Sequence, residues 1–119
     1  WSSDVCSSDL VRIAALLAQD ARLCLLDEPL AHLDLRHQVE VLRLLTARAR
    51  ERGTCLVMAL HEAHWAARFC DRALLLNADG TMRCGAAGEL LTADELGRLY
   101  GWPMEDAGGG RGYFVPRDV

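Results

Sequence analysis

The sequence predicts an α/β fold, a parallel sheet with flanking helices followed by a hairpin and a short helix. Two apolar runs, residues 22–27 and 54–60, are continuous rather than alternating, which is typical of strands in parallel sheets. Residues 35–52 lie between them and carry apolar side chains at helical spacing. Strand, helix and strand therefore form one right-handed crossover unit.

Composition places the chain among ordinary soluble domains. It has 119 residues, of which 51% are hydrophobic and 25% charged. A net charge of -4 gives no general electrostatic reason to bind nucleic acid, so we expect no nucleic-acid partner. No apolar run is long enough to cross a bilayer. The five cysteines form no C-x-x-C pair, which favours a reduced, cytosolic setting.

The first third of the chain contains a leader, a helix and a strand. Residues 1–10 begin with Trp1 and include the self-similar "SSDVCSSDL", so we expect a non-native or artefactual leader. Residues 11–19 have helical periodicity that ends near Asp20. The run 22–27 then predicts a strand buried on both faces.

The predicted helix at 35–52 has a clear stop signal, because Gly53 follows its last turn. Arginines occur along it at Arg43, Arg48, Arg50 and Arg52. They form either a phosphate-binding patch or a solvated face that complements the negative end of the helix dipole, and the second interpretation is favoured.

The remaining residues predict shorter elements. Residues 61–71 predict a helix, and 72–85 predict two strands joined by a turn at 77–80. Thr92 and Glu95 have capping-box spacing for a helix that runs to Tyr100. Residues 101–119 are glycine-rich and predict an irregular tail, with a short strand near 112–115.

Three polar side chains follow the two buried strands. Asp27 and Glu28 close the first strand, and His61 follows the second. Because parallel strands bring their carboxyl ends to one edge of a sheet, we expect all three side chains at that edge, where ligands collect. Two carboxylates and an imidazole suit a hydrated metal ion, an oriented water and an anionic group, which phosphoryl transfer requires together.

Two stretches resemble a known family. "LCLLDEPLAHLD" (23–34) resembles the Walker B strand and D-loop of ATP-binding cassette (ABC) ATPases, and "LVMALHEAHWAARFCDRALLLNADGTMRCG" (56–85) resembles their switch-histidine segment. The resemblance covers residues 11–100 and implies a partial P-loop NTPase fold. It implies that Asp27 holds Mg²⁺ through water, that Glu28 is the general base, and that His61 contacts the γ-phosphate of ATP. Asp34 matches the D-loop aspartate, which faces the opposite subunit.

Departures from the family pattern concern the phosphate cradle. The chain has no G-x-x-x-x-G-K-[ST] loop, no lysine at all and no identifiable Q-loop. "SSDVCSSDL" also stands where a glycine-rich signature is expected. We therefore expect residues 11–100 to be the carboxyl-terminal part of an ABC ATPase domain that is inactive alone.

The segment 77–101 resembles the tail of importer ATPases, and the final "GYFVP" resembles those that serve cobalamin and iron-siderophore importers. This implies a homodimer on membrane permease subunits, peripheral on the cytoplasmic face of the membrane, with ATP and Mg²⁺ as cofactors.

Three alternatives stay open. His61, Glu62 and His64 could serve metal-dependent hydrolysis, although Trp65 occupies the position where H-E-x-x-H needs its second histidine. The chain could be a non-catalytic α/β interaction module. It could also be an ABC ATPase of repair or translation rather than transport.

Overall fold

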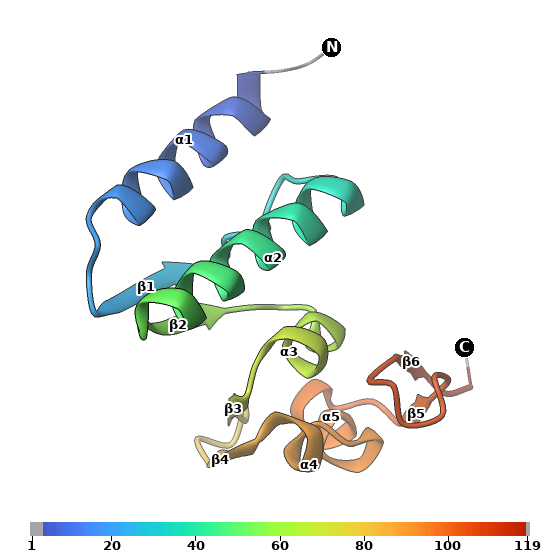
Figure 1. Cartoon of the computed structure of the whole chain (residues 1–119). Coiled ribbons are helices and arrows are strands. Elements are labelled where there is room, and N and C mark those ends of the chain that lie inside the picture. The colour runs from blue at the N-terminus through green and yellow to red at the C-terminus, as the bar shows by residue number, and fades with distance from the viewer. Residues whose placement is uncertain (1–3, 119) are drawn as a thin grey trace. The chain divides into compact units, whose positions relative to one another are not determined.

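The computed structural model describes residues 4–118 and divides into two compact units, residues 1–61 and 62–119. The first unit contains α1 (Asp4–Ala18), β1 (Leu23–Asp27), α2 (Leu35–Arg52) and β2 (Cys55–Ala59) (Figure 1). The strands β1 and β2 pair in parallel, from Leu23 opposite Cys55 to Asp27 opposite Ala59. The predicted strand, helix and strand order and the α/β class are confirmed.

The helix α1 begins earlier than its periodicity predicts. It starts at Asp4 rather than at Val11, so residues 4–10 continue directly into the predicted helix. Residues 1–3 of the expected leader lie outside the described residues.

The helix α2 matches its prediction at both ends because its caps are local. Asp34 is the N-cap, and Gly53 is the C-cap in the left-handed region (φ 62°), where glycine is favoured. Leu42 and Leu45, which are 0% and 1% exposed, form the buried stripe of the helix together with Val41. Burial of this stripe, rather than intrinsic helix propensity, supplies most of the helix stability.

The prediction that β1 is buried on both faces was wrong for the described chain. Cys24 is buried, but Leu23 and Leu25 are 54% and 69% exposed, and Val57 on β2 is 50% exposed. The described residues form a two-stranded sheet here, with β1 and β2 as its members. On one face Cys24 is buried and Leu26, Leu56 and Met58 are half-buried. Leu23, Leu25 and Val57 lie on the other face, which the described residues leave open.

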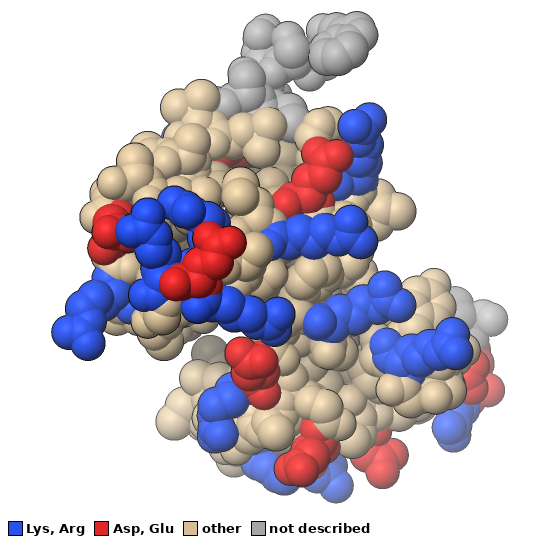
Figure 2. All heavy atoms as spheres, viewed as in Figure 1, with Lys and Arg blue, Asp and Glu red and all other residues tan. Residues whose placement is uncertain are grey.

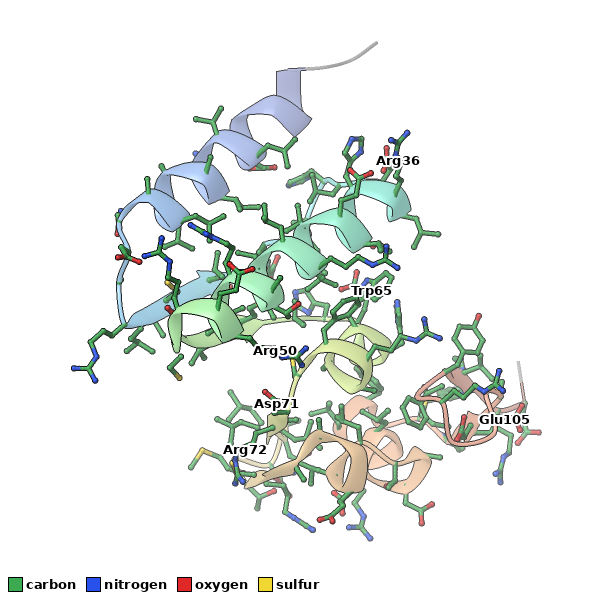
Figure 3. All side chains as sticks on the ribbon, viewed as in Figure 1. Arg36, Arg50, Trp65, Asp71, Arg72 and Glu105 are labelled. Carbon is green, nitrogen blue, oxygen red and sulfur yellow. The ribbon has the colours of Figure 1, made fainter. Side chains whose placement is uncertain are left out.

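Three arginines of α2 form ion pairs with acidic side chains. Arg36 contacts Glu40 at 3.0 Å, Arg48 contacts Glu51 at 3.5 Å, and Arg52 contacts Asp20 at 3.0 Å. Arg36 extends from the first turn into solvent (Figure 3). Figure 2 shows basic and acidic side chains interleaved on the visible face. This pattern favours the solvated face over the phosphate patch.

The second unit contains seven short elements. They are α3 (Ala63–Phe69), β3 (Arg72–Leu76), β4 (Met82–Ala86), α4 (Ala87–Leu90), α5 (Ala93–Tyr100), β5 (Met104–Asp106) and β6 (Phe114–Pro116). The antiparallel pair β3–β4, with its turn closed by the Gly80 N–H donating to the Asn77 carbonyl, confirms the predicted hairpin. Thr92 caps α5 and accepts from the Glu95 amide at 3.3 Å, as predicted.

Two features of this unit lie beyond the prediction. The sequence pattern gave no signal for α4, and the tail contains an antiparallel pair, β5–β6, rather than one short strand. The core of the unit consists of Leu75, Ala87, Leu90, Leu91 and Leu96. Among residues 4–118, none of the helices has the length and apolarity that crossing a membrane requires.

Candidate functional site

The first unit brings Asp27, Glu28 and His61 to the carboxyl ends of its parallel strands. Asp27 lies opposite Ala59 in the β1–β2 register. The Glu28 N–H donates to the Ala59 carbonyl at 3.1 Å, so the ladder extends one residue beyond β1. His61 follows two residues after Ala59. Parallel pairing therefore fixes the three residues at one end of the sheet.

Glu28 and His61 contact each other directly. The distance from His61 Nε2 to Glu28 Oε1 is 2.5 Å. The pair is open to solvent, with side-chain exposures of 77% for His61 and 48% for Glu28. An exposed pair of this kind adds little to the stability of the fold.

The backbone turns sharply at Glu28. Its φ is 47°, in the left-handed region that glycine favours. The Glu28 carbonyl accepts from the Ala31 N–H at 3.1 Å, which closes a turn directly after the strand. The turn leads the chain away from the sheet while the Glu28 carboxylate stays beside His61. Sequence patterns carry no direct signal for this conformation at a glutamate.

Asp34 lies at the N-cap of α2 and is engaged by His37. Its Oδ1 atom accepts from the His37 backbone N–H at 2.9 Å and lies 2.8 Å from His37 Nδ1. These contacts, the backbone hydrogen bond first, lower the pKa of Asp34 below its ordinary value of 3.8. The observed contacts of Asp34 are those of a helix cap, whereas the sequence interpretation assigned it only the role of the D-loop aspartate.

A lowered pKa makes the Asp34 cap sensitive to acid. A carboxyl group with a depressed folded-state pKa stabilises the fold above its ordinary value, and the contribution is lost as the pH falls below 3.8. Asp34→Asn keeps the capping oxygen but does not titrate. We therefore expect near-wild-type stability at neutral pH and a smaller loss of stability at acid pH. Asp34→Ala removes the cap, so we expect lower stability at neutral pH. Urea midpoints at pH about 7 and about 3 measure both effects. Identical profiles for all three proteins would contradict this role.

The oxygen ligands of the site suit magnesium. Asp27 and Glu28 supply carboxylate oxygens, the ligands that this hard cation prefers, and both are exposed at the strand ends. The glycine-rich stretch 107–112 is not a free phosphate cradle, because the Gly108 and Gly110 N–H groups donate to the Asp106 carboxylate at 2.9 and 2.5 Å. Asp27 and Glu28 thus fit the part of a nucleotide site that holds the metal ion and the attacking water. Residues 4–118 contain no phosphate-binding loop with its lysine.

His61 and His64 have different surroundings. His61 contacts Glu28, whereas the His64 ring lies 4.5 Å from the ring of Trp65. Trp65 lies on α3 (Figure 3). Within the part of the chain that the structure describes, no three His, Cys, Asp or Glu side chains are grouped as the three protein ligands of a catalytic zinc ion would be. The metal-hydrolase alternative therefore has no support from the described geometry.

Comparison with known proteins connects this geometry to a family. The chain is 41% identical over 92 residues to the hemin import ATP-binding protein HmuV of Bordetella avium. It is 38% identical over 89 residues to the ferric enterobactin transport ATP-binding protein FepC of Escherichia coli K12. It is 40% identical over 90 residues to the iron(3+)-hydroxamate import ATP-binding protein FhuC of Bacillus subtilis. The chain is homologous to the ATP-binding subunits of ABC importers.

The fold agrees with this homology. A chain of a metal-chelate type ABC transporter, solved in an inward-facing conformation, superposes with a TM-score of 0.80 and 32% identity. The match covers 91% of the present chain and 45% of the transporter chain. No protein-family model matches the sequence.

The comparisons cover only part of each relative. The alignments with HmuV, FepC and FhuC include 77%, 75% and 76% of the present chain. They include 35%, 33% and 34% of those three import proteins. The chain thus spans about a third of the length of these curated relatives.

Two residues next to the site were missed by the sequence interpretation. His37 contacts Asp34, and the Gln38 side chain contacts carbonyls of the loop that follows Glu28. His37 stands three residues after an N-cap, a spacing at which side chains often contact the cap. Gln38 gave no such signal, because its partners are backbone groups of a loop.

Proposed function

We propose that this chain supplies the magnesium side and the catalytic base of the ATP site in an ABC importer ATPase. One observation carries the proposal: parallel pairing of β1 and β2 places Glu28 Oε1 2.5 Å from His61 Nε2 at the edge where such folds bind ligands. The homology to import ATP-binding proteins supports it.

Each side chain has a chemical role in this proposal. Asp27 would hold the hydrated Mg²⁺ through water. The Glu28 carboxylate orients the attacking water and accepts a proton from it, and His61 contacts the γ-phosphate. Asp34 fixes the start of α2, where the family resemblance places contact with the opposite subunit. When bound, Mg²⁺ neutralises the phosphate charge that this carboxylate-rich edge would otherwise repel.

We also propose an assembly and a cargo for the parent ATPase. The ATPase subunits form a homodimer on permease subunits, peripheral on the cytoplasmic side of the membrane. The relatives are named for import of hemin, ferric enterobactin and iron(3+)-hydroxamate, which favours an iron chelate or porphyrin as cargo. Cobalamin, to which the tail motif also points, is the second candidate.

Calorimetry with Mg-ATP tests whether these residues supply only the metal and base part of the ATP site and lack the phosphate-binding part. The chain of 119 residues has no lysine and no phosphate loop, so we expect no saturable heat of binding. A full-length protein that joins these residues to a phosphate loop and a glycine-rich signature is expected to bind and hydrolyse ATP. Tight, saturable binding by the chain of 119 residues would contradict the proposal that it lacks the phosphate-binding part of the site. Absence of hydrolysis by the full-length protein would contradict the proposed ATPase activity.

A further inference from the structure

The loop between β1 and α2 adopts an unfavourable backbone conformation at two positions. Glu28 has φ 47° and His32 has φ 65°, and neither is glycine. Non-glycine residues in the left-handed region are energetically unfavourable and persist only when the surroundings hold them. Something must therefore hold this loop in place.

Part of the restraint comes from the loop itself. Leu30 and Leu33 are 3% and 7% exposed, so both side chains anchor the loop in the core of the first unit. The Ala31 N–H donates to the Glu28 carbonyl at 3.1 Å, and the Leu33 N–H donates to the Leu30 carbonyl at 3.2 Å. These contacts define two successive turns but do not tie them to α2.

The Gln38 side chain makes that connection. Its Nε2 group donates to the Leu30 carbonyl at 3.4 Å and to the Leu33 carbonyl at 3.2 Å. The two hydrogens of an amide NH₂ group allow one donor for each carbonyl. Gln38 is half-buried on the first turn of α2, where its own N–H donates to the Asp34 carbonyl at 2.9 Å. One side chain thus joins both turns of the loop to a capped helix.

We propose that Gln38 is a positioning residue that holds the loop so that the Glu28 carboxylate stays beside His61. It acts through the loop backbone and not on substrate. The consequence for hydrolysis rests on the proposed function, in which Glu28 is the base. The structural consequence, a loop ordered by Gln38, does not depend on that function.

The experiment uses two substitutions and a matched control. Gln38→Met keeps an unbranched side chain of similar length without donors, and Gln38→Glu keeps the planar shape but replaces the NH₂ group by oxygen. Gln19→Met makes the same change at an exposed glutamine beyond the end of α1. Circular dichroism confirms that each variant is folded, and agreement between the two Gln38 variants separates loss of the donors from a packing defect.

The first readout is structural and uses the chain of 119 residues. We expect amide exchange at Ala31 and Leu33 to accelerate by about tenfold in both Gln38 variants. We also expect the ring nitrogen resonances of His61 to move toward their positions in Glu28→Ala, which removes the side chain that His61 contacts and serves as the reference for a lost pair. Wild-type exchange rates and wild-type His61 resonances in folded Gln38 variants would overturn the proposal.

The second readout is kinetic and uses the full-length protein. We expect kcat for ATP hydrolysis to fall about tenfold in the Gln38 variants with little change in KM, because a misplaced base slows the chemical step. Gln19→Met should retain wild-type kcat. If Glu28→Gln abolishes turnover but the Gln38 variants match Gln19→Met, the positioning role is wrong. If Glu28→Gln itself has no effect, the proposed function fails, while the exchange data still decide whether Gln38 orders the loop.

Discussion

Replacing Glu28 by glutamine in the full-length protein is expected to lower ATP turnover by about 10²–10⁴-fold, the usual contribution of a general base. The amide has the size of the carboxylate and can still contact His61, but it cannot take a proton from water. The terminal phosphate then remains uncleaved, and we expect ATP to stay bound. Phosphate release measures turnover, and identification of the nucleotide that elutes with the purified protein measures retention.

Glu62→Gln is the matched control for this experiment. Glu62 is exposed next to His61, and its side chain makes no capping hydrogen bond at the start of α3. The same change of charge at this position is expected to leave turnover near the wild-type level. Unchanged turnover in Glu28→Gln, with Glu62→Gln also unchanged, would remove Glu28 from the role of base.

Truncation of Leu42 is expected to have the largest effect on stability. Leu42 is 0% exposed on the buried stripe of α2, so Leu42→Ala removes apolar contacts and leaves a cavity in a helix that borders the site. We expect the free energy of unfolding to fall by about 3 kcal/mol, within the range for buried leucines. That loss is a large fraction of the stability of a small domain. Urea unfolding followed by circular dichroism measures it.

Leu44 offers the same substitution on the same helix at a position that is 48% exposed. Leu44→Ala is expected to change the unfolding free energy by less than about 1 kcal/mol, because a half-exposed side chain loses fewer contacts. Equal losses in Leu42→Ala and Leu44→Ala would show that the assigned buried face of α2 is wrong.

Much of the site could be predicted because it depends on short-range patterns and on one topological rule. The helix at 35–52 was predicted at both ends, since its apolar spacing and Gly53 are local signals. The strands followed from continuous apolar runs, and the helix between them predicted a crossover that joins parallel strands. Parallel strands end at one edge, so the proximity of Glu28 and His61 required no knowledge of side-chain packing.

Other features could not be predicted because they depend on contacts between distant residues. Continuous apolar runs indicated strands buried on both faces, yet Leu23 and Leu25 are exposed in the described chain. A continuous apolar run indicates that the side chains favour burial. It does not indicate which element packs against them. Short elements such as α4 and β5, with four and three residues, are stabilised by their neighbours and carry weak periodicity of their own.

Local signals in the sequence were sufficient to predict the order of the elements, the ends of α2 and the edge at which Asp27, Glu28 and His61 gather, because periodicity, capping and strand polarity are encoded locally. Two contacts became known only from the folded chain: Glu28 contacts His61, and Gln38 joins the loop of Glu28 to α2. These contacts depend on backbone conformations, such as the left-handed turn at Glu28, that the surrounding fold stabilises against local preference.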